Sequence, residues 1–449
     1  MDELMARIED RTAKVAVIGL GYVGLPLAVG FARAGYHVLG LDVDERKVAA
    51  VNGGRSYIQD VAASDLAAMV QVGRLSATID YDLLRSLDAI LICVPTPFDA
   101  MKAPDLSYIE QAAQGIAQRL RRGQLVILQS TTYPGTTEEF VLPILEESGL
   151  KAGEDFYLAF SPERINPGDR QFTVENTPKV VGGLTPRCTK LAQQLLVQLF
   201  PHVHVVSSLR SAEMSKLLEN IFRSVNIALV NELALLCERM GIDIWEVIEA
   251  AKTKPFGYMP FYPGPGVGGH CIPVDPNYLS WKAREYDFYT KFIELAAEVN
   301  QTMPHHTVDL VAQALSQTGK PLDGAKILIL GVAFKRDIDD ARNSPAERII
   351  ELLLKRGAQV SYSDPYVPRY RVGRDVFHPE EHWLESITLT DRVLEIADCV
   401  VIVAGHQAVD YVRVLHQACL VVDTVNATRG LIGPARVVRV GAPLQEHAG

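Results

Sequence analysis

One cysteine, Cys271, stands in the stretch PGPGVGGHCIPVDP, which covers residues 263–276. Its four glycines and four prolines exclude a helix or an ordinary strand. A thiol held in such a loop could be a zinc ligand, a cysteine at a structural bend, or a catalytic nucleophile. Zinc is poorly supported because a zinc site needs about four ligands, and only His270 lies beside the cysteine. Asp275 favours covalent catalysis, in which a thiolate attacks an aldehyde and a carboxylate manages protons.

The sequence GLGYVG, residues 19–24, has the spacing of a dinucleotide-binding loop. It follows the apolar run at 15–18 and opens a helical pattern, so the glycines would let the backbone approach a pyrophosphate. Asp42 ends the next expected strand, where a carboxylate binds the adenosine ribose and repels a 2′-phosphate, which favours NAD over NADP. A glycine turn in a domain that binds nothing is the alternative. The predicted NAD contacts here are Gly19, Gly21, Tyr22, Val23, Gly24, Asp42 and Lys47.

A second loop, GVAFKRDIDDARNSP at 331–345, follows another strand pattern but has one glycine where a dinucleotide needs three. Lys335, Arg336 and Arg342 stand in it among acids. Such a cationic loop at a strand end could hold a second nucleotide without dinucleotide geometry. A solvated run of charges is the alternative.

The segment 211–241 has helical periodicity and contains neither glycine nor proline before Gly241. Lys216 and Asn220 are four residues apart and so share one face of this helix. Directed into a cleft, a lysine and an amide could polarise a carbonyl group and stabilise an oxyanion. Directed outward, they would only be solvated. The length of the helix suggests that it links two domains and forms a dimer surface.

The elements around these residues predict an α/β protein. Short apolar strands alternate with helical patterns up to about residue 210, and the strand–helix–strand pattern returns at 326. We predict two Rossmann-like doubly wound parallel-sheet domains joined by a long central helix. The expected boundaries are 1–210 for the NAD-binding domain, 211–305 for a central helical domain with the cysteine loop, and 306–449 for a second nucleotide domain.

Composition excludes several classes of protein. The chain has 449 residues, 48% of them hydrophobic, and a formal net charge of −10, which argues against nucleic-acid binding. Its six cysteines are far apart and form no CxxC pair, which fits a reducing compartment rather than a disulfide framework. The first residues lack the apolar core of a signal peptide, and no apolar run approaches the roughly 20 residues of a membrane span. We expect a cytoplasmic protein without membrane or nucleic-acid partners.

Taken together, these motifs resemble the UDP-glucose/GDP-mannose dehydrogenase family of NAD-dependent nucleotide-sugar 6-dehydrogenases. The resemblance spans nearly the whole chain, through GLGYVGLP, STTYPGTT, FSPERINPGD, AEMSKLLEN, GGHCIPVDP and FKRDIDDARNSP. Within the family, SPERINPGD and the sequence after GGHC are most similar to the UDP-N-acetylglucosamine 6-dehydrogenase branch, which serves polysaccharide synthesis. The family's enzymes oxidise the C6 alcohol twice, consuming two NAD, to a carboxylate.

The resemblance implies a role for each matching residue. Cys271 would trap the aldehyde as a thiohemiacetal and carry the thioester. Lys216 and Asn220 would stabilise the oxyanion, and Asp275 would assist proton transfer near the thiol. Further implied contacts are Thr131 and Glu163 to water, nicotinamide and sugar, Thr96 to the cofactor, Lys335 and Arg342 to UDP, and Arg164, Asn166, Phe261, Tyr262 and Gly268 to the substrate. No metal is implied. The arginine of the DxRxSP motif often reaches a neighbouring subunit, so we expect a homodimer or higher oligomer.

Two departures from the family pattern concern the sugar. UDP-glucose dehydrogenases commonly have an acid where this chain has Pro167, and a lysine where it has Val274. Both differences favour an acetamido sugar, with UDP-GlcNAc first and UDP-ManNAc or UDP-glucose as alternatives. Two rival functions stay open: a two-electron hydroxyacid dehydrogenase, which would need neither the thiol nor the second nucleotide domain, and a nucleotide-sugar sensor without catalysis.

Overall fold

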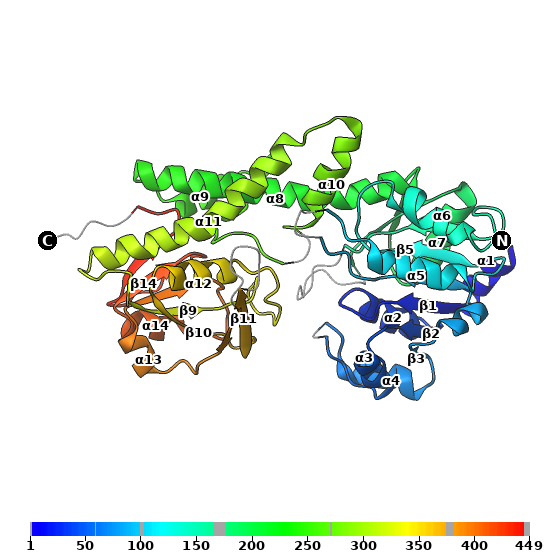
Figure 1. Cartoon of the computed structure of the whole chain (residues 1–449), viewed down its shortest axis with the longest axis horizontal. Helices are drawn as coiled ribbons and strands as arrows, with labels where there is room; N and C mark the ends of the chain where they lie inside the picture. Colours follow the sequence, from blue (N-terminus) through cyan, green and yellow to red (C-terminus); the bar gives the residue numbers. More distant parts are fainter. Residues whose placement is uncertain are drawn as a thin grey trace. The chain divides into compact units, whose positions relative to one another are not determined.

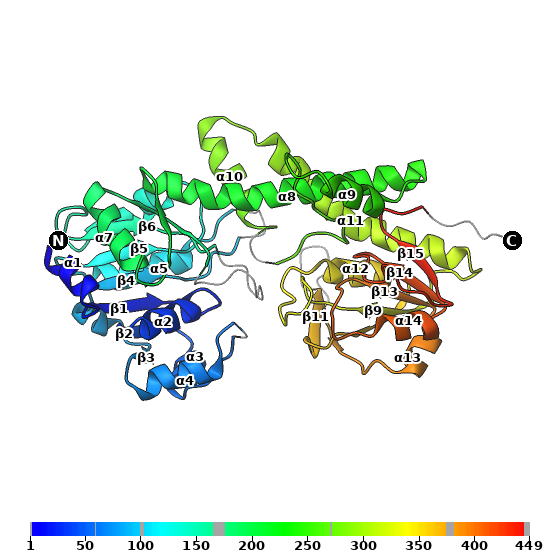
Figure 2. The same cartoon turned by 180° about the vertical axis from the view of Figure 1, so that it is seen from behind.

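The computed structural model describes residues 2–58, 60–98, 103–164, 176–269, 272–373 and 381–443 (Figures 1 and 2). The predicted nucleophile Cys271, its neighbour His270 and the predicted sugar contact Asn166 lie outside these residues. The chain forms two compact units. The N-terminal unit contains residues 1–219 and 281–288, and the C-terminal unit contains residues 220–280 and 289–449.

The N-terminal unit is built on an eight-stranded sheet in the order β3-β2-β1-β4-β5-β6-β7-β8. All neighbouring strands are parallel except β6 and β7. The strands are β1 (Lys14–Ile18), β2 (His37–Leu41), β3 (Leu75–Thr78), β4 (Ala89–Ile92), β5 (Leu125–Leu128), β6 (Tyr157–Phe160), β7 (Lys179–Gly183) and β8 (Val203–Val205). The helices are α1 (Asp2–Glu9), α2 (Gly24–Arg33), α3 (Glu45–Asn52), α4 (Ala63–Gln71), η1 (Tyr81–Ser86), α5 (Ser107–Ala117), the π-helical turn η2 (Thr136–Val141), α6 (Leu142–Glu146) and α7 (Pro186–Leu196).

The C-terminal unit repeats this design around a five-stranded parallel sheet in the order β10-β9-β13-β14-β15. Its strands are β9 (Lys326–Leu330), β10 (Gln359–Ser363), β13 (Cys399–Ile402), β14 (Leu420–Asp423) and β15 (Arg436–Arg439), with a separate antiparallel hairpin of β11 (Arg369–Gly373) and β12 (Glu381–Glu385). Its helices are α9 (Ile244–Lys252), α11 (Lys291–Ser316), α12 (Pro345–Lys355), α13 (Asp391–Ile396) and α14 (Tyr411–Gln417).

Both sheets are buried on both faces. Successive residues of a strand point to opposite sides of the sheet, so a sheet with two buried faces divides each strand between two apolar clusters. In β1, Val15 and Val17 belong to one apolar cluster and Ala16 and Ile18 to another. In the C-terminal unit, alternate residues of β9 divide between two clusters in the same way. The prediction of two doubly wound parallel-sheet domains joined by a long helix is therefore confirmed.

Two helices pass from one unit into the other. Helix α8 (Leu209–Met240) has 32 residues and enters the C-terminal unit at Asn220. Helix α10 (Asp275–Ala283) begins in the C-terminal unit, and its last residues belong to the N-terminal unit with η3 (Arg284–Tyr286). Among the described residues, α8 alone is long and apolar enough to cross a membrane, a test that the core helices of soluble proteins also pass. The predicted domain boundary after residue 305 falls inside the continuous helix α11.

Candidate functional site

The glycine loop after β1 has the geometry of a dinucleotide cradle. Gly19 has a φ of +91°, and a Cβ there would lie 2.5 Å from the carbonyl oxygen of Cys93. A Cβ on Gly24 would lie 1.8 Å from the Gly19 oxygen, so both positions require glycine. A Cβ on Gly21 would meet nothing within 4 Å. The open side of the loop therefore faces the space that a pyrophosphate needs at the start of α2. Tyr22 is exposed there.

The acid at the end of β2 binds the glycine loop. Asp42 Oδ2 accepts the N–H of Leu20 at 2.8 Å and lies 3.1 Å from Lys47 Nζ. Its Oδ1 accepts the N–H of Asp44 at 2.9 Å, and its side chain keeps an exposed fraction of 7%. The sequence did not reveal Tyr57, whose hydroxyl donates to the Leu20 carbonyl at 2.7 Å, so that Asp42 binds the N–H of Leu20 and Tyr57 binds its carbonyl. These residues fit NAD, and the negative charge opposes a 2′-phosphate.

The segments after β4 and β5 place two predicted threonines. Ser130 Oγ donates to the Val94 carbonyl at 2.8 Å and ties the two segments together. Thr96 and Thr131 follow these strands and are both half-buried. Cys93, at the end of β4, is buried, and burial raises the pKa of its thiol to about 12. This cysteine therefore stays protonated near neutral pH and has the properties of a structural residue.

Glu163, after β6, forms an ion pair that the sequence did not reveal. Its Oε2 lies 2.8 Å from Nζ of Lys179, the first residue of β7, whose side chain is 1% exposed. Its Oε1 accepts the N–H of Arg164 at 2.8 Å. Glu163 is therefore held as an acceptor with a fixed orientation. The Arg164 side chain is bound by Glu219 at 2.8 Å and by the Pro178 carbonyl at 2.7 Å.

Helix α8 brings two buried ionisable groups to the N-terminal unit. Lys216 is 7% exposed, and no described residue forms a hydrogen bond or ion pair with its ammonium group. One turn earlier, Glu213 is fully buried and accepts the N–H groups of Gly135 and Thr137 at 2.6 and 2.9 Å. Burial raises the pKa of Glu213 to about 7, although these donors and the Thr137 hydroxyl oppose the rise. Glu213 thus clamps the loop that carries Thr131.

Further along α8, in the C-terminal unit, Asn220 contacts Asp275, a contact between two predicted catalytic residues that the sequence did not suggest. Asn220 is 1% exposed, and its Nδ2 donates to Asp275 Oδ2 at 2.5 Å. Its Oδ1 accepts from Arg223 at 2.7 Å, a contact that the sequence did not suggest. Asp275 is the first residue of α10, where the positive end of the helix dipole favours its charge.

The glycine-proline loop packs against the cationic loop of the same unit. A Cβ on Gly268 would lie 2.8 Å from both the Asn343 oxygen and the Phe334 Cβ, so only glycine fits there. Gly269, with a φ of +90°, donates to the Arg342 carbonyl at 3.2 Å and accepts from Asn343 Nδ2 at 3.1 Å. Gly268 and Gly269 are therefore held in one defined path.

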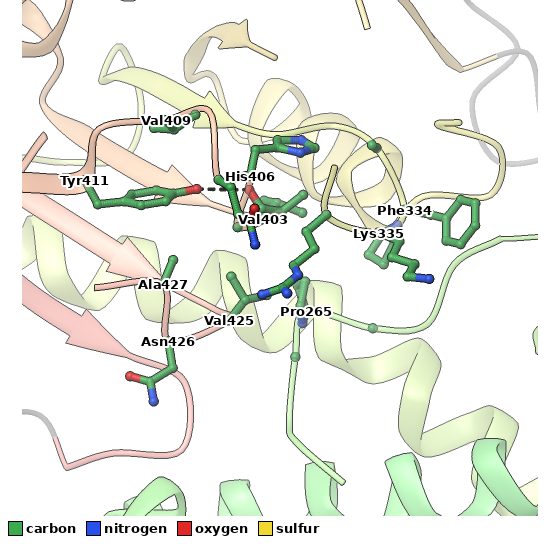
Figure 3. A pocket seen from close by; sticks show the side chains of 18 residues that line it. Pro265, Phe334, Lys335, Val403, His406, Val409, Tyr411, Val425, Asn426 and Ala427 are labelled. Atoms are coloured by element: carbon green, nitrogen blue, oxygen red, sulfur yellow. Dashed lines mark hydrogen bonds between the residues drawn. The ribbon is translucent and has the colours of Figure 1, made fainter. Parts of the chain in front are cut away.

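A cavity of about 580 Å³ opens at the carboxyl ends of β9, β13 and β14, where Lys335 lies among its lining residues (Figure 3). The lining is formed by residues 264–266, 333–336, 345, 403–407, 409, 411 and 425–427. Arg342 is outside this lining and pairs with Asp340 at 2.6 Å. Phe261 and Tyr262 are also outside it: their rings lie 5.7 Å from Phe222 and 5.9 Å from Trp245. Arg336, which was not assigned to UDP, lines the cavity, whereas Arg342, which was assigned to UDP, does not.

No group of three or more histidine, cysteine or acidic side chains that could hold a metal occurs within the part of the chain that the structure describes.

Three family models cover most of the chain. They describe the NAD binding, central and UDP binding domains of the UDP-glucose/GDP-mannose dehydrogenase family and match residues 13–200, 210–302 and 328–430. The cavity thus lies between strand ends of the region matched by the UDP binding domain, apart from the three lining residues of the glycine-proline loop.

Individual relatives have different sugars in their names. The UDP-N-acetyl-D-glucosamine 6-dehydrogenase of Pseudomonas aeruginosa is 40% identical over 79% of this chain and 83% of its own length. The NDP-N-acetyl-D-galactosaminuronic acid dehydrogenase of Ralstonia nicotianae is 36% identical over 96% of this chain and 98% of its own. The solved structure of the UDP-D-ManNAc dehydrogenase of Pyrococcus horikoshii superposes with a TM-score of 0.86 at 33% identity, over 95% of this chain and 99% of that one.

Proposed function

Because the chain belongs to the UDP-glucose/GDP-mannose dehydrogenase family and is an NAD-dependent UDP-sugar 6-dehydrogenase, we propose that its substrate is a UDP-N-acetylhexosamine, first of all UDP-GlcNAc. The product is then the corresponding uronic acid, a precursor for polysaccharide synthesis.

One observation carries this proposal: the loop whose sequence contains the thiol also forms a wall of the cavity in the region matched by the UDP binding domain. Gly264, Pro265 and Gly266 line the cavity, and Cys271 follows five residues later in the chain. Gly268 and Gly269 pack on Phe334 between these two points. A UDP moiety bound in the cavity beside Lys335 would direct its sugar along this loop toward the thiol. A hydroxyacid dehydrogenase would have no use for such an arrangement.

We propose chemistry in which the thiol carries the sugar between two hydride transfers. When bound, NAD supplies the acceptor for each of the two hydrides that leave C6. The Cys271 thiolate adds to the aldehyde carbon, and loss of the second hydride from the thiohemiacetal gives a thioester. Water then cleaves the carbon–sulfur bond, which returns the thiol and releases the carboxylate. The Lys216 ammonium group and the Asn220 amide would stabilise the negative oxygen, and Glu163 with Thr131 would hold the water.

The identity of the sugar is supported by two observations. Of the three relatives above, the one with the highest identity is named for the GlcNAc nucleotide. Val274 stands where UDP-glucose dehydrogenases commonly have a lysine, and here its side chain is 4% exposed. A lysine at this buried position would bring an ammonium group into a place that now holds an apolar side chain.

The proposal is tested by following NADH with UDP-GlcNAc, UDP-GalNAc, UDP-ManNAc, UDP-glucose and GDP-mannose. We expect UDP-GlcNAc to have the highest kcat/KM and to yield two NADH for each uronate. One NADH per sugar would refute the four-electron reaction, and binding of UDP-sugars without any NADH would indicate a sensor. Cys271→Ser should abolish uronate formation, because an alkoxide ester would form or hydrolyse too slowly.

We further propose that the enzyme is a homodimer in the cytoplasm. In the C-terminal unit, α8 exposes an apolar stripe at helical spacing, formed by Phe222, Leu229, Leu233, Leu236 and Met240. A second copy of the chain would bury this stripe. Light scattering after gel filtration should give twice the monomer mass, and Leu229→Asp with Leu236→Asp should give the monomer. A monomeric wild-type protein would contradict the proposal.

A further inference from the structure

The turn after β9 repeats the turn after β1. Gly331 has a φ of +82°, close to the +91° of Gly19. The N–H of Gly331 donates to the carbonyl of Ser363, the last residue of β10, just as the N–H of Gly19 donates to that of Leu41, the last residue of β2. In each half an aspartate follows the second strand. Asp364 therefore occupies the position that Asp42 has in the NAD-binding half.

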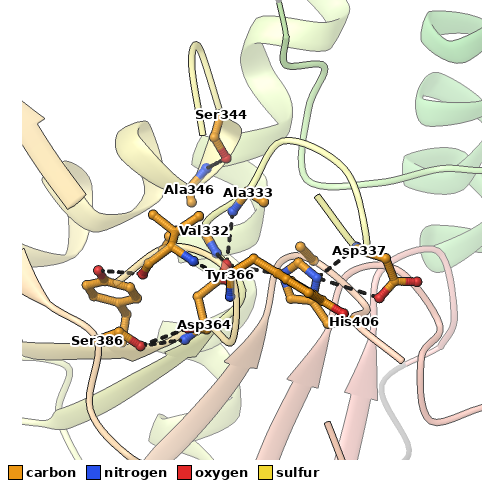
Figure 4. Close-up of polar contacts among 12 residues, drawn as sticks. Val332, Ala333, Asp337, Ser344, Ala346, Asp364, Tyr366, Ser386 and His406 are labelled. Carbon is orange, nitrogen blue, oxygen red and sulfur yellow. Dashed lines mark hydrogen bonds and ion pairs between the residues drawn. The ribbon is translucent and has the colours of Figure 1, made fainter. Parts of the chain in front are cut away.

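Asp364 differs from Asp42 because its carboxylate is completely enclosed. Its side chain has no exposed surface. Oδ2 accepts from the backbone N–H groups of Val332 and Ala333 and from His406 Nε2, and Oδ1 accepts from the backbone N–H groups of Tyr366 and Val367 (Figure 4). The pKa of Asp364 is lowered despite its burial, because these donors, with His406 first among them, favour the charged form. No edge of this carboxylate is left for a ribose, and Asp364 does not line the cavity.

His406 has two fixed hydrogen bonds that define its tautomer. Its Nδ1 accepts the N–H of Asp337 at 2.9 Å, so Nδ1 has no proton. Its Nε2, which lies 3.1 Å from Asp364 Oδ2, must therefore be the donor. The ring has no exposed surface and packs edge-on against Tyr366, with 5.1 Å between ring centroids. Although His406 belongs to the residues that line the cavity, its imidazole cannot contact a ligand directly.

These bonds end at the cationic loop. Asp337 has a φ of +62°, in the left-handed region that residues other than glycine rarely adopt. Two contacts hold it there: its N–H donates to His406, and its Oδ1 accepts the N–H of Gln407 at 2.8 Å. The left-handed residue comes directly after residues 333–336, which line the cavity. The backbone conformation of Asp337 therefore sets the path of the chain on the C-terminal side of Lys335 and Arg336.

We propose that His406 is a positioning residue for UDP binding, which holds Asp337 in its left-handed conformation and thereby keeps the Lys335–Arg336 segment in the cavity wall. Asp364 serves as the anchor of His406 instead of as a ribose acceptor. The inference rests on the proposed function, because it takes the cavity to be the UDP site. It explains why this half would bind a mononucleotide although its turn repeats that of the dinucleotide half.

Titration calorimetry with UDP tests the proposal on three variants of the full chain. An asparagine carbonyl can take the place of Nδ1, so His406→Asn should keep the UDP Kd within about threefold. A glutamine amide can replace Nε2 but not Nδ1, so His406→Gln should weaken UDP about tenfold, as should His406→Ala. The KM for NAD should not change in any of them. Equal Kd values for all variants, or Kd losses that simply follow the thermal midpoints, would overturn the proposal.

A second pair of variants avoids the buried site. Asp337→Gly keeps the left-handed backbone without strain but loses the hydrogen bond to the Gln407 N–H. Asp337→Asn keeps the left-handed backbone and also keeps that hydrogen bond. UDP should bind several-fold more weakly to the glycine variant and normally to the asparagine variant. Identical UDP binding in these two would overturn the loop argument. If the wild-type protein did not bind UDP, the proposed function would be wrong. If every His406 variant bound UDP with the wild-type Kd, only the positioning role of His406 would be wrong.

Discussion

Asn220 and Asp275 are joined by a hydrogen bond of 2.5 Å from Nδ2 to Oδ2, which links helix α8 to the first residue of helix α10. Arg223 donates to the other end of the same amide at 2.7 Å. The amide is therefore locked, with its nitrogen toward the carboxylate and its oxygen toward the guanidinium group. The group expected to stabilise an oxyanion and the group expected to move a proton are thus mechanically coupled.

Asn220→Asp should lower kcat about 100-fold at pH 8, because a second carboxylate would face Asp275 at hydrogen-bond distance. Part of the activity should return on acidification, when the two acids can share a proton. The matched control is Asn226→Asp, the same change on the same helix, whose amide donates to the Phe222 carbonyl of the preceding turn. Initial rates of NADH formation across pH 6–9 decide the outcome. A rate within threefold of wild type at pH 8 would contradict the coupling.

Lys179→Met should destabilise the N-terminal unit, because Glu163 would keep a half-buried charge without its cation. Breaking such a pair costs about 3–5 kcal/mol. Adding Glu163→Gln should restore much of the thermal midpoint, although not the activity, because the double variant removes both charges. Lys190→Met, on the exposed side of α7, is the control and should have little effect. If the double variant were no more stable than Lys179→Met, the ion pair would not explain the loss.

The residues predicted from the sequence are those whose role depends on local spacing. Gly19, Gly24 and Asp42 are recognisable because a turn, a helix start and a strand end lie within one short unit, and the structure has all three. Lys179 and Glu213 could not be recognised in this way. Their partners are 16 and 78 positions away, and each is a polar residue beside an apolar run that gives no separate signal.

Loop geometry limited the prediction in a different way. Lys335, Arg336 and Arg342 are equivalent in the sequence as cations of one loop, but only the first two line the cavity. The left-handed conformation of Asp337 separates them, and it depends on His406, 69 positions away. A Lys–Asn pair at helical spacing predicted a shared face of α8, but not that Asn220 would bind Asp275, since that contact requires the path of the whole glycine-proline loop.

Asp42→Asn should raise the KM for NAD about tenfold and narrow the preference for NAD over NADP. The amide oxygen can still accept the Leu20 N–H, but the amide NH₂ must then face the Asp44 N–H, which Oδ1 now accepts at 2.9 Å. The charge that opposes a 2′-phosphate is lost as well, so the cofactor ratio, which a change of loop shape alone would not move, reports on that charge. Asp82→Asn, an exposed acid in the same unit, is the control. The ratio of kcat/KM for the two cofactors is the measurement. An unchanged ratio would show that Asp42 does not face the ribose.

Glu213 should make the stability of the N-terminal unit depend on pH. Its pKa is about 7 in the folded chain, against an ordinary value of 4.5. Between these two values the folded state keeps a proton that the unfolded state has lost, so its stabilising contribution is complete below pH 4.5 and is lost as the pH rises through 7. The difference corresponds to about 3 kcal/mol, or several degrees in the thermal midpoint.

Glu213→Gln removes this titration and should flatten the fall in thermal midpoint between pH 5 and pH 8. It should also lower the midpoint at pH 5, because the amide NH₂ must face either the Gly135 or the Thr137 N–H. Glu147→Gln, on an exposed glutamate of the same unit, should keep the wild-type slope. Calorimetric scans of the three proteins at both pH values provide the measurement. If Glu213→Gln kept the full wild-type slope, another group would be responsible, and the buried carboxyl would titrate outside this range.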